Sequence, residues 1–219
     1  EDMLEAFLSG DMTDLQSRLN VGNLVRASGS GANTQVDVSE PDLLAFQRLF
    51  EQLGLPRAEL DAAVKELLDS TRLALGDPQP SRTALLPTKL SHLAWLGISR
   101  ASLARLEPHV TVLPQRSTLN LNTASAEAMA AAVPGLDLAS ARRLVTARER
   151  QPFNTLAEAR QALPTGAPPL SDQLHGVRSQ FFEVRGRLRL DDVVIEERSM
   201  VVRNNLDVRV AWRERFVRP

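Results

Sequence analysis

The side chains that could carry out chemistry are sparse, and their spacing does not build a catalytic site. The chain has no cysteine, which excludes disulfides, thiolate metal sites and cysteine nucleophiles. A phosphate-binding glycine loop and a dinucleotide fingerprint are also missing from the sequence. The histidines show no metal-ligand spacing and stand beside no Ser or Cys nucleophile pattern; they are His92, His109 and His175. We therefore expect no enzyme, no catalytic residue and no cofactor.

Two acidic pairs have a spacing that could share a cation. Glu66 and Asp69 stand three residues apart in a helical pattern, and Asp11 and Asp14 stand three apart near the N-terminus. A solvated helix face accounts for the first pair, and turn capping accounts for the second. We predict no metal site from these pairs alone.

A segment in the second half of the chain could hold a phosphate. Residues 119–137 read LNLNTASAEAMAAAVPGLD and precede a predicted helix that starts at Leu138. Backbone amides in a hairpin beside a helix N-terminus can bind phosphate. The segment resembles the tandem helix–hairpin–helix modules of DNA-binding competence proteins, through its Asn-Thr-Ala start and the later Pro152-Phe153. A DNA-binding module is therefore the alternative function, and its candidate residues are Arg142, Arg143 and Arg148.

Two observations oppose DNA binding. The second hairpin glycine of those modules is Asp137 here, which places a carboxylate where a phosphate would lie. As an N-cap, Asp137 would instead accept amides of the helix that follows. Residues 117–165 contain 5 Arg and 4 acidic residues, too small an excess for strong counterion release.

Helical periodicity dominates residues 39–163. The pair Ser39 and Asp42 predicts a capping box at the start of the first helix. Two pairs of short helices then each flank a break, which predicts a weak repeat of helix–hairpin–helix, or SAM-like, units; the pairs are 89–96 with 100–106, and 125–133 with 138–149. A last short helix follows Thr155. The remaining segments are predicted loops or linkers, over residues 27–36, 76–87 and 164–172.

Near the C-terminus the hydrophobic period changes from 3.6 to 2. Phe182, Val184 and Leu188 alternate with charged residues, and three antiparallel strands are predicted with turns at 191–192 and 204–205. Three strands with one apolar face need more cover, so the non-helical stretch 7–25 is expected to add a strand. The predicted fold class is α+β: residues 1–26 and 173–219 share a sheet, and residues 27–172 form an inserted all-α domain.

Composition restricts the class of protein further. The 219 residues are 43% hydrophobic and carry a formal net charge of −1, ordinary values for a globular domain rather than a nucleic-acid coat. The sequence contains no run of about 18 apolar residues that could span a bilayer. The chain starts at Glu1, so we expect that a preceding segment has been removed.

The order of several motifs resembles the minor pseudopilin K family of bacterial type II secretion. Residues 14–25, DLQSRLNVGNLV, are similar to the family pattern D-x-x-G-R-F-N-L-N-N-L-V. Residues 106–114, LEPHVTVLP, and 119–124, LNLNTA, resemble the family's L-x-P-(F/Y)-V-T-(A/V)-L-P and (I/V)-N-(V/M)-N-T-A. Residues 181–188, FFEVRGRL, match its first C-terminal strand. The motif residues carried over are Asp14, Arg18, Asn20, Asn23, Asn120, Asn122, Thr123 and Gly135.

The resemblance implies a structural role. Members of this family have a pilin-like sheet with a large helical insertion, and they start with a prepilin signal and a hydrophobic helix, both absent here. They assemble with minor pseudopilins I and J at the tip of the pseudopilus, and they have no catalytic activity. The resemblance therefore implies a periplasmic domain, an anchor of the full-length protein in the inner membrane, and secreted proteins as further candidate partners.

One departure from the family concerns calcium. Many members carry a D-W-(I/L)-D-x-D helix end and a G-A-E-D loop that ligate calcium, whereas ELLDSTR stands here at residues 66–72 and the acidic loop is missing. A calcium ion needs several oxygen ligands, and only Asp69 and Asp77 remain nearby. We expect no tight calcium site, although Asp11 and Asp14 leave a site gathered from elsewhere open.

Overall fold

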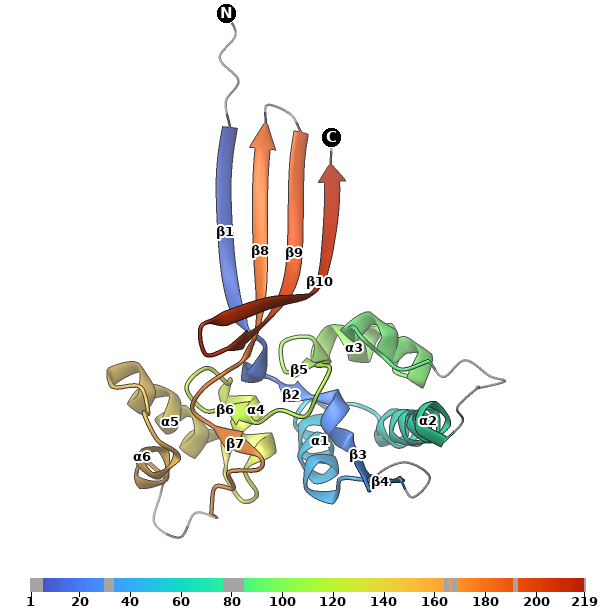
Figure 1. The fold of residues 1–219 in the computed structure, drawn as a ribbon. Coiled ribbons are helices and arrows are strands. Elements are labelled where there is room, and N and C mark those ends of the chain that lie inside the picture. Colours follow the sequence, from blue (N-terminus) through green and yellow to red (C-terminus); the bar gives the residue numbers. More distant parts are fainter. Residues whose placement is uncertain are drawn as a thin grey trace, which may run out of the picture. The chain divides into compact units, whose positions relative to one another are not determined.

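The structure is a computed structural model that describes residues 6–29, 34–76, 85–163, 166, 169–190 and 193–218. The chain divides into two compact units (Figure 1). A sheet unit comprises residues 1–16 and 178–219, and a helical unit comprises residues 17–177. Long antiparallel strands lie in the first unit and nearly all helices in the second, which confirms the predicted α+β class.

The sheet unit is a four-stranded antiparallel sheet. Its strand order is β1–β8–β9–β10, formed by β1 (Ala6–Asp14), β8 (Phe181–Leu190), β9 (Val193–Asn204) and β10 (Asp207–Arg218). The N-terminal strand pairs with the first C-terminal strand, as predicted, so that Asp14 faces Phe182. The turn after β9 contains Asn205 at φ 55°, a left-handed conformation that asparagine tolerates well. The predicted turn at residues 191–192 lies outside the described residues.

One face of this sheet carries the predicted alternating apolar side chains. Because side chains of directly paired residues share a face, the register defines rows that run across the strands. One row is entirely apolar and contains Leu8, Leu188, Ile195 and Val217. The adjacent row contains Gly10, Gly186, Glu197 and Arg215.

The opposite face is charged and contains a buried carboxylate. Glu183 accepts a 2.6 Å hydrogen bond from Arg185 Nε and a 2.7 Å bond from Arg198 Nη2. Burial opposes ionisation of this carboxyl, but the two guanidinium hydrogen bonds outweigh burial and lower the pKa of Glu183. The charged face thus stabilises the sheet through paired arginines and acids.

The helical unit contains six α-helices, one long 3₁₀ helix and three short strand pairs among its described residues. The strand pairs are β2 (Leu19–Asn20) with β5 (Val110–Thr111), β3 (Val25–Ser28) with β4 (Gln35–Val38), and β6 (Leu119–Asn120) with β7 (His175–Gly176). The helices are α1 (Glu40–Gln52), α2 (Arg57–Gly76), η4 (Leu90–Leu96), α3 (Arg100–Leu106), α4 (Ala126–Ala132), α5 (Leu138–Arg150) and α6 (Leu156–Gln161).

The two predicted helix–hairpin–helix units are present. The pair η4 and α3 is joined through Gly97 at φ 94°, and the pair α4 and α5 through Gly135 at φ 73°. Both glycines adopt the left-handed conformation that ends a helix. The helix after each hairpin starts with a side-chain cap: Ser99 accepts from the Ser102 amide and Asp137 from the Ser140 amide. The shared apolar core includes the fully buried side chains Leu49, Leu60, Leu106, Leu121, Met129 and Leu144.

The change from sheet to helical unit occurs earlier than the predicted boundary after residue 26. Residues 17–26 belong to the helical unit, because β2 and the 3₁₀ turn η2 (Val21–Leu24) attach there. The second boundary also differs from the prediction. Strand β7 pairs inside the helical unit, so this unit ends after Val177 instead of residue 172.

Two local predictions were wrong. Residues 27–36 were predicted as a loop, but residues 27–28 and 35–36 belong to the antiparallel strands β3 and β4; residues 30–33 of this prediction lie outside the described residues. No capping box forms at α1, because the Ser39 hydroxyl donates to the Asp42 carboxylate at 2.6 Å instead of accepting a backbone amide. Most of the predicted loop 76–87 lies outside the described residues.

Candidate functional site

The N-terminal family-motif residues meet in a buried polar cluster of the helical unit. We call this set the asparagine cluster; it consists of Asn20, Asn23, Asp42, Arg116 and Ser117. Asn20 has 3% exposure and serves as the N-cap of η2, since its Oδ1 accepts the Gly22 amide at 3.0 Å. The same oxygen accepts the Leu113 amide at 3.0 Å. Asn20 therefore joins segments that are 93 residues apart in the chain.

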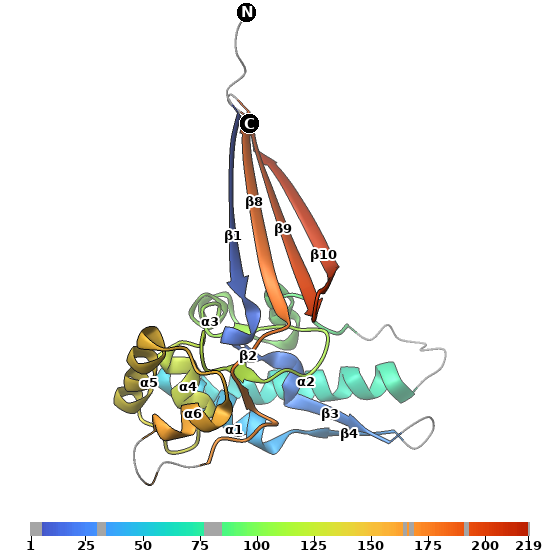
Figure 2. The same cartoon turned by 60° about the vertical axis from the view of Figure 1, so that its left-hand side comes forward.

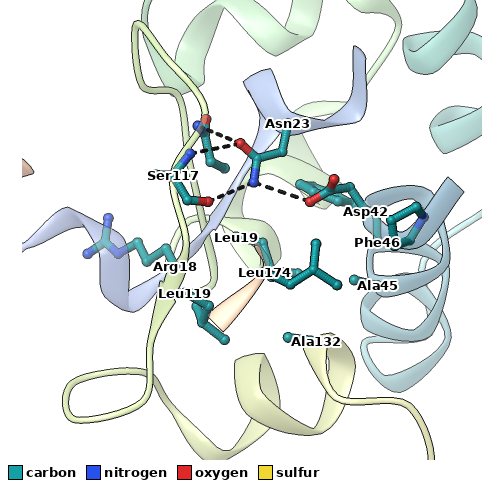
Figure 3. Close-up of a pocket in the computed structure, with 12 residues that line it drawn as sticks. Arg18, Leu19, Asn23, Asp42, Ala45, Phe46, Ser117, Leu119, Ala132 and Leu174 are labelled. Carbon is teal, nitrogen blue, oxygen red and sulfur yellow. Dashed lines mark hydrogen bonds between the residues drawn. The ribbon is translucent and has the colours of Figure 1, made fainter. Parts of the chain in front are cut away.

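Asn23 extends this cluster toward α1 (Figure 3). Its Nδ2 donates to the Ser117 carbonyl at 2.8 Å and to Asp42 Oδ1 at 3.2 Å. Its Oδ1 accepts the Ser117 amide at 3.1 Å and Asn20 Nδ2 at 3.1 Å. An amide supplies both donors and acceptors on one rigid plane, so an asparagine can bind a loop on one side and a helix on the other.

Asp42 is the charged centre of the asparagine cluster. Arg116 Nη2 donates to Asp42 Oδ2 at 2.8 Å, and Arg116 Nη1 donates to the Asn23 carbonyl at 2.8 Å. The Asp42 side chain is 9% exposed, whereas that of Arg116 is 39% exposed. A buried carboxylate is tolerated only when hydrogen bonds replace its water. The cluster therefore holds the loop at residues 111–118 against the start of α1.

The cavity beside the asparagine cluster is too small for a ligand. Its volume is about 20 Å³, and its walls include Arg18, Leu19 and Phe46. Small-molecule sites generally enclose about 300–1,000 Å³. The cluster is therefore a structural latch, and the predicted motif residue Arg18 lies at its wall.

The second family motif forms a separate junction around Asn122. Its Nδ2 donates to the carbonyls of Phe153 at 2.8 Å and Val177 at 3.0 Å, and its Oδ1 accepts the Phe153 amide at 2.8 Å. Asn120 Oδ1 accepts the Asn122 amide at 2.9 Å, and the Thr123 amide donates to the Asn120 carbonyl at 3.2 Å. Asn122 thus ties the loop before α6 to the exit strand of the helical unit.

Asp14 belongs to the sheet unit, where it acts as a turn residue. Its Oδ1 accepts the Gln16 amide at 2.8 Å, and its Oδ2 accepts the Ser179 hydroxyl at 2.7 Å. The motif residues therefore do not form one site: they stabilise three places where the chain turns or crosses.

The arginines of the DNA-binding alternative differ in how the fold engages them. Arg148 Nη1 donates to the carbonyls of Leu121 at 2.7 Å and Ala124 at 2.6 Å, and burial lowers its pKa. Arg142 and Arg143 are both exposed, and Arg143 donates to the Ser140 hydroxyl at 2.7 Å. The Asp137 carboxylate accepts the Ser140 amide at 2.6 Å, as predicted, and so occupies the helix N-terminus. Because its Nη1 already donates to two carbonyls, Arg148 has less hydrogen-bonding capacity left for a phosphate.

The histidines have structural environments. His175 is 2% exposed, and its Nδ1 accepts the Ser171 amide at 3.1 Å. Burial lowers the pKa of His175 despite nearby groups that favour its charged form. His109 is half-buried and contacts the Ser125 hydroxyl at 3.3 Å, and burial lowers its pKa as well. His92 stacks on the exposed Trp95 with 4.1 Å between ring centroids.

The described acidic residues named for calcium lie on two elements, α2 and β1. Glu66 and Asp69 are exposed on α2, and Asp77 lies outside the described residues. Asp11 is exposed on β1, whereas Asp14 is engaged in its turn. Across the described part of the chain, no group of three His, Cys, Asp or Glu side chains is placed to hold a metal ion.

Sequence reasoning missed Arg48 and Arg116, which donate to backbone carbonyls inside the helical unit, as well as the role of Asp42. Arg116 sits in a segment without periodicity, so nothing in the sequence marked it. Arg48 does carry a signal, because it interrupts the apolar run of α1 between Phe46 and Leu49; its Nε donates to the Ala131 carbonyl at 2.6 Å.

Comparison with known proteins identifies the class to which this fold and these latches belong. Two family models, both described as type II secretion system protein K, match residues 17–115 and 119–178. Together they span most of the chain, which therefore belongs to the protein K family of type II secretion, a family of minor pseudopilins. Both matches lie almost wholly within the helical unit. The first includes Asn20 and Asn23, and the second includes Asn120 and Asn122.

Individual relatives agree with this assignment. Type II secretion system protein K of Pseudomonas aeruginosa is 31% identical over 103 residues, which is 47% of this chain and 31% of that protein. The match thus spans just under a third of the relative's length. A chain of the crystal structure of the GspK–GspI–GspJ complex from enterotoxigenic Escherichia coli has the same fold, with a TM-score of 0.65 over 98% of this chain and 84% of that one, at 15% identity. Among the described residues, no helix is both long and apolar enough to cross a membrane.

Proposed function

We propose that this chain is the periplasmic part of a minor pseudopilin that caps the tip of the type II secretion pseudopilus. In this role it binds minor pseudopilins I and J, has no catalytic activity, and supports export of folded proteins across the outer membrane. The full-length protein is anchored in the inner membrane. One structural neighbour is a chain of a GspK–GspI–GspJ complex, which supports I and J as the partners of this chain.

The observation that carries this proposal is the size of the inserted helical unit. Residues 17–177 interrupt the four-stranded sheet between β1 and β8 and fold around their own core. A pilin-like subunit buried within a fibre has neighbours above and below. An insertion of this bulk is best tolerated at the end of the fibre, where no subunit packs above it.

Deleting the helical unit tests the capping role. Ser179 donates to Asp14 and the Gln180 amide donates to Gln16 Oε1 at 2.7 Å, so the two ends of the sheet unit lie close together. A short glycine–serine linker can therefore replace residues 17–177. We expect the variant to keep its sheet, as judged by Trp212 fluorescence, and to fail to restore secretion in a strain that lacks the gene. Normal secretion by this variant would contradict capping by the helical unit.

A duplex-binding titration separates this proposal from the DNA-binding alternative. At about 50 mM salt, non-specific electrostatic binding to DNA is strong. We expect no binding at micromolar protein, because Asp137 occupies the hairpin end and the half-buried Arg148 donates to two backbone carbonyls. Micromolar binding that is lost when Arg142 and Arg143 become alanine would instead favour the alternative.

We also propose that the chain does not bind calcium tightly. Support comes from the missing acidic loop and from the exposed positions of Glu66 and Asp69 on α2. Calorimetry with calcium should show no stoichiometric binding at micromolar affinity. Binding at that affinity, lost in Asp69→Asn, would contradict the proposal.

A further inference from the structure

The outer strand β10 is an unusually open sheet edge. It contains 12 residues and borders only β9 within the sheet (Figures 1 and 2). Its register shifts between Val210 and Trp212, and the pairing is regular from Trp212 onward. In that regular stretch Phe216 is 43% exposed and Val217 is 63% exposed, and their side chains project from opposite faces. A long edge with apolar side chains on both faces invites pairing with another strand.

The same chain protects another edge in a different way. Strand β4 has only four residues, and Arg72 closes its outer edge by donating to the Val36 carbonyl from Nε at 3.2 Å and Nη2 at 3.0 Å. Short length and a side chain bound to the edge are usual protections against unwanted pairing. The regular part of β10 has the opposite properties, which is consistent with an edge kept for a partner.

The charge of β10 distinguishes it from the other edge of the sheet. By sequence β10 contains four arginines and two acidic residues, whereas β1 contains two acidic residues and no basic ones. Arg213 and Arg215 are fixed along β10, because both bind Glu197, at 3.2 and 2.9 Å. Their side chains remain 55% and 62% exposed. An acidic strand would thus be attracted to β10 and repelled by β1.

We propose that β10 is the docking edge for an extended, net-acidic segment of a partner pseudopilin, which joins the sheet as a fifth strand. Main-chain hydrogen bonds would supply affinity, and Arg213 and Arg215 would favour an acidic segment over others. The inference rests on the proposed function, because it supposes that minor pseudopilins I and J bind this chain.

A matched pair of variants tests this edge. Val217 and Leu8 stand at opposite ends of one apolar row, on β10 and β1, with exposures of 63% and 81%. In a binding titration with the soluble I and J domains, Val217→Glu should weaken binding roughly tenfold. Val217→Lys and Leu8→Glu should each leave affinity within about threefold of the unchanged chain, because one keeps a positive edge and the other alters the distant edge.

Amide hydrogen exchange supplies a second measurement that does not depend on any variant. Complex formation should slow exchange across residues 212–217 and leave residues 6–12 unchanged. Binding without that protection, or an equal loss of affinity in Leu8→Glu and Val217→Glu, would overturn the assignment of β10 as the docking edge and leave the proposed function intact. Self-association of the chain alone, with both edges protected, would make the occupant a second copy. Absence of any binding to I and J would overturn both proposals.

Discussion

The helical unit and the sheet unit bury their apolar side chains to different extents. The continuous core lies entirely within residues 19–170, and Leu49, Leu121 and Leu144 have no exposed surface there. In the sheet unit, apolar side chains remain exposed on both outer strands, including Leu8 at 81% and Val208 at 61%. One unit has a complete core, whereas the other has a single layer of strands.

This difference indicates how each unit gains stability. A domain usually needs two packed layers to remove apolar surface from water. The helical unit meets this requirement alone and adds buried latches at Asn23 and Asn122. The sheet unit buries fewer apolar side chains, among them Phe181 and Met200, and carries exposed cross-strand ion pairs such as Glu197 with Arg215 at 2.9 Å. The two tryptophans, Trp95 in the helical unit and Trp212 in the sheet, allow each unit to be followed separately.

The largest effect should come from a cavity in the helical core. Leu144→Ala removes a side chain with no exposed surface and should lower the free energy of unfolding of the helical unit by about 3 kcal/mol. The matched change Leu8→Ala, at an 81% exposed position, should change stability by less than about 0.5 kcal/mol. Urea unfolding of the two single-tryptophan forms measures both. If Leu144→Ala lowered the free energy of unfolding equally in the helical unit and the sheet unit, the two units would share one core.

The second effect should come from the asparagine cluster. Asp42→Ala leaves Arg116, Asn23 and Ser39 without their shared acceptor and should cost about 2–3 kcal/mol, since Arg116 at 39% exposure recovers some water. The control Asp61→Ala removes an exposed ion pair with Arg57 and should cost under about 0.5 kcal/mol. Thermal unfolding followed at Trp95 distinguishes them. A small loss for both would mean that the cluster does not act as a latch.

The smallest effect should be a difference between the two units in how their stability depends on pH. Burial keeps the pKa of His175 below its ordinary value of 6.5, so below pH 6.5 the unfolded chain binds a proton that the folded helical unit does not. The helical unit should lose stability from pH 6.5 downward until the pH reaches the lowered folded pKa. The sheet unit has no histidine, and the lowered pKa of Glu183 means that its loss begins only near pH 4.5. Simultaneous losses would contradict this assignment.

Much of the fold could be predicted because local signals agreed with the final structure. Helical periodicity and hairpin glycines placed α4 and α5, and Asp137 was correctly predicted as a cap. Period-two alternation placed the C-terminal strands. The β3–β4 hairpin was missed because its residues are small and polar, and its pairing depends on packing beside α2 rather than on sequence pattern.

The candidate site was less predictable than the fold. The motif resemblance identified Asn20, Asn23 and Asn122, but a motif does not say what its amides bind. Asn20 reaches Leu113 across 93 residues and Asn122 reaches Val177 across 55, and such pairings arise only from the tertiary fold. For the same reason the role of Asp42 was wrongly predicted: its neighbour Ser39 is close in sequence, whereas Arg116 is not.

The pairing of Leu8 with Leu188 has a consequence for the order of folding. Strand β1 is synthesised first but cannot complete its sheet until the roughly 160 residues of the helical unit have followed. At about 5–20 residues per second, that delay lasts roughly 8–30 seconds. During this time the helical unit can fold on its own and bring its two ends together, which shortens the loop that β1 and β8 must close. A slow-folding helical unit would therefore prolong the exposure of β1 as an unpaired, aggregation-prone strand.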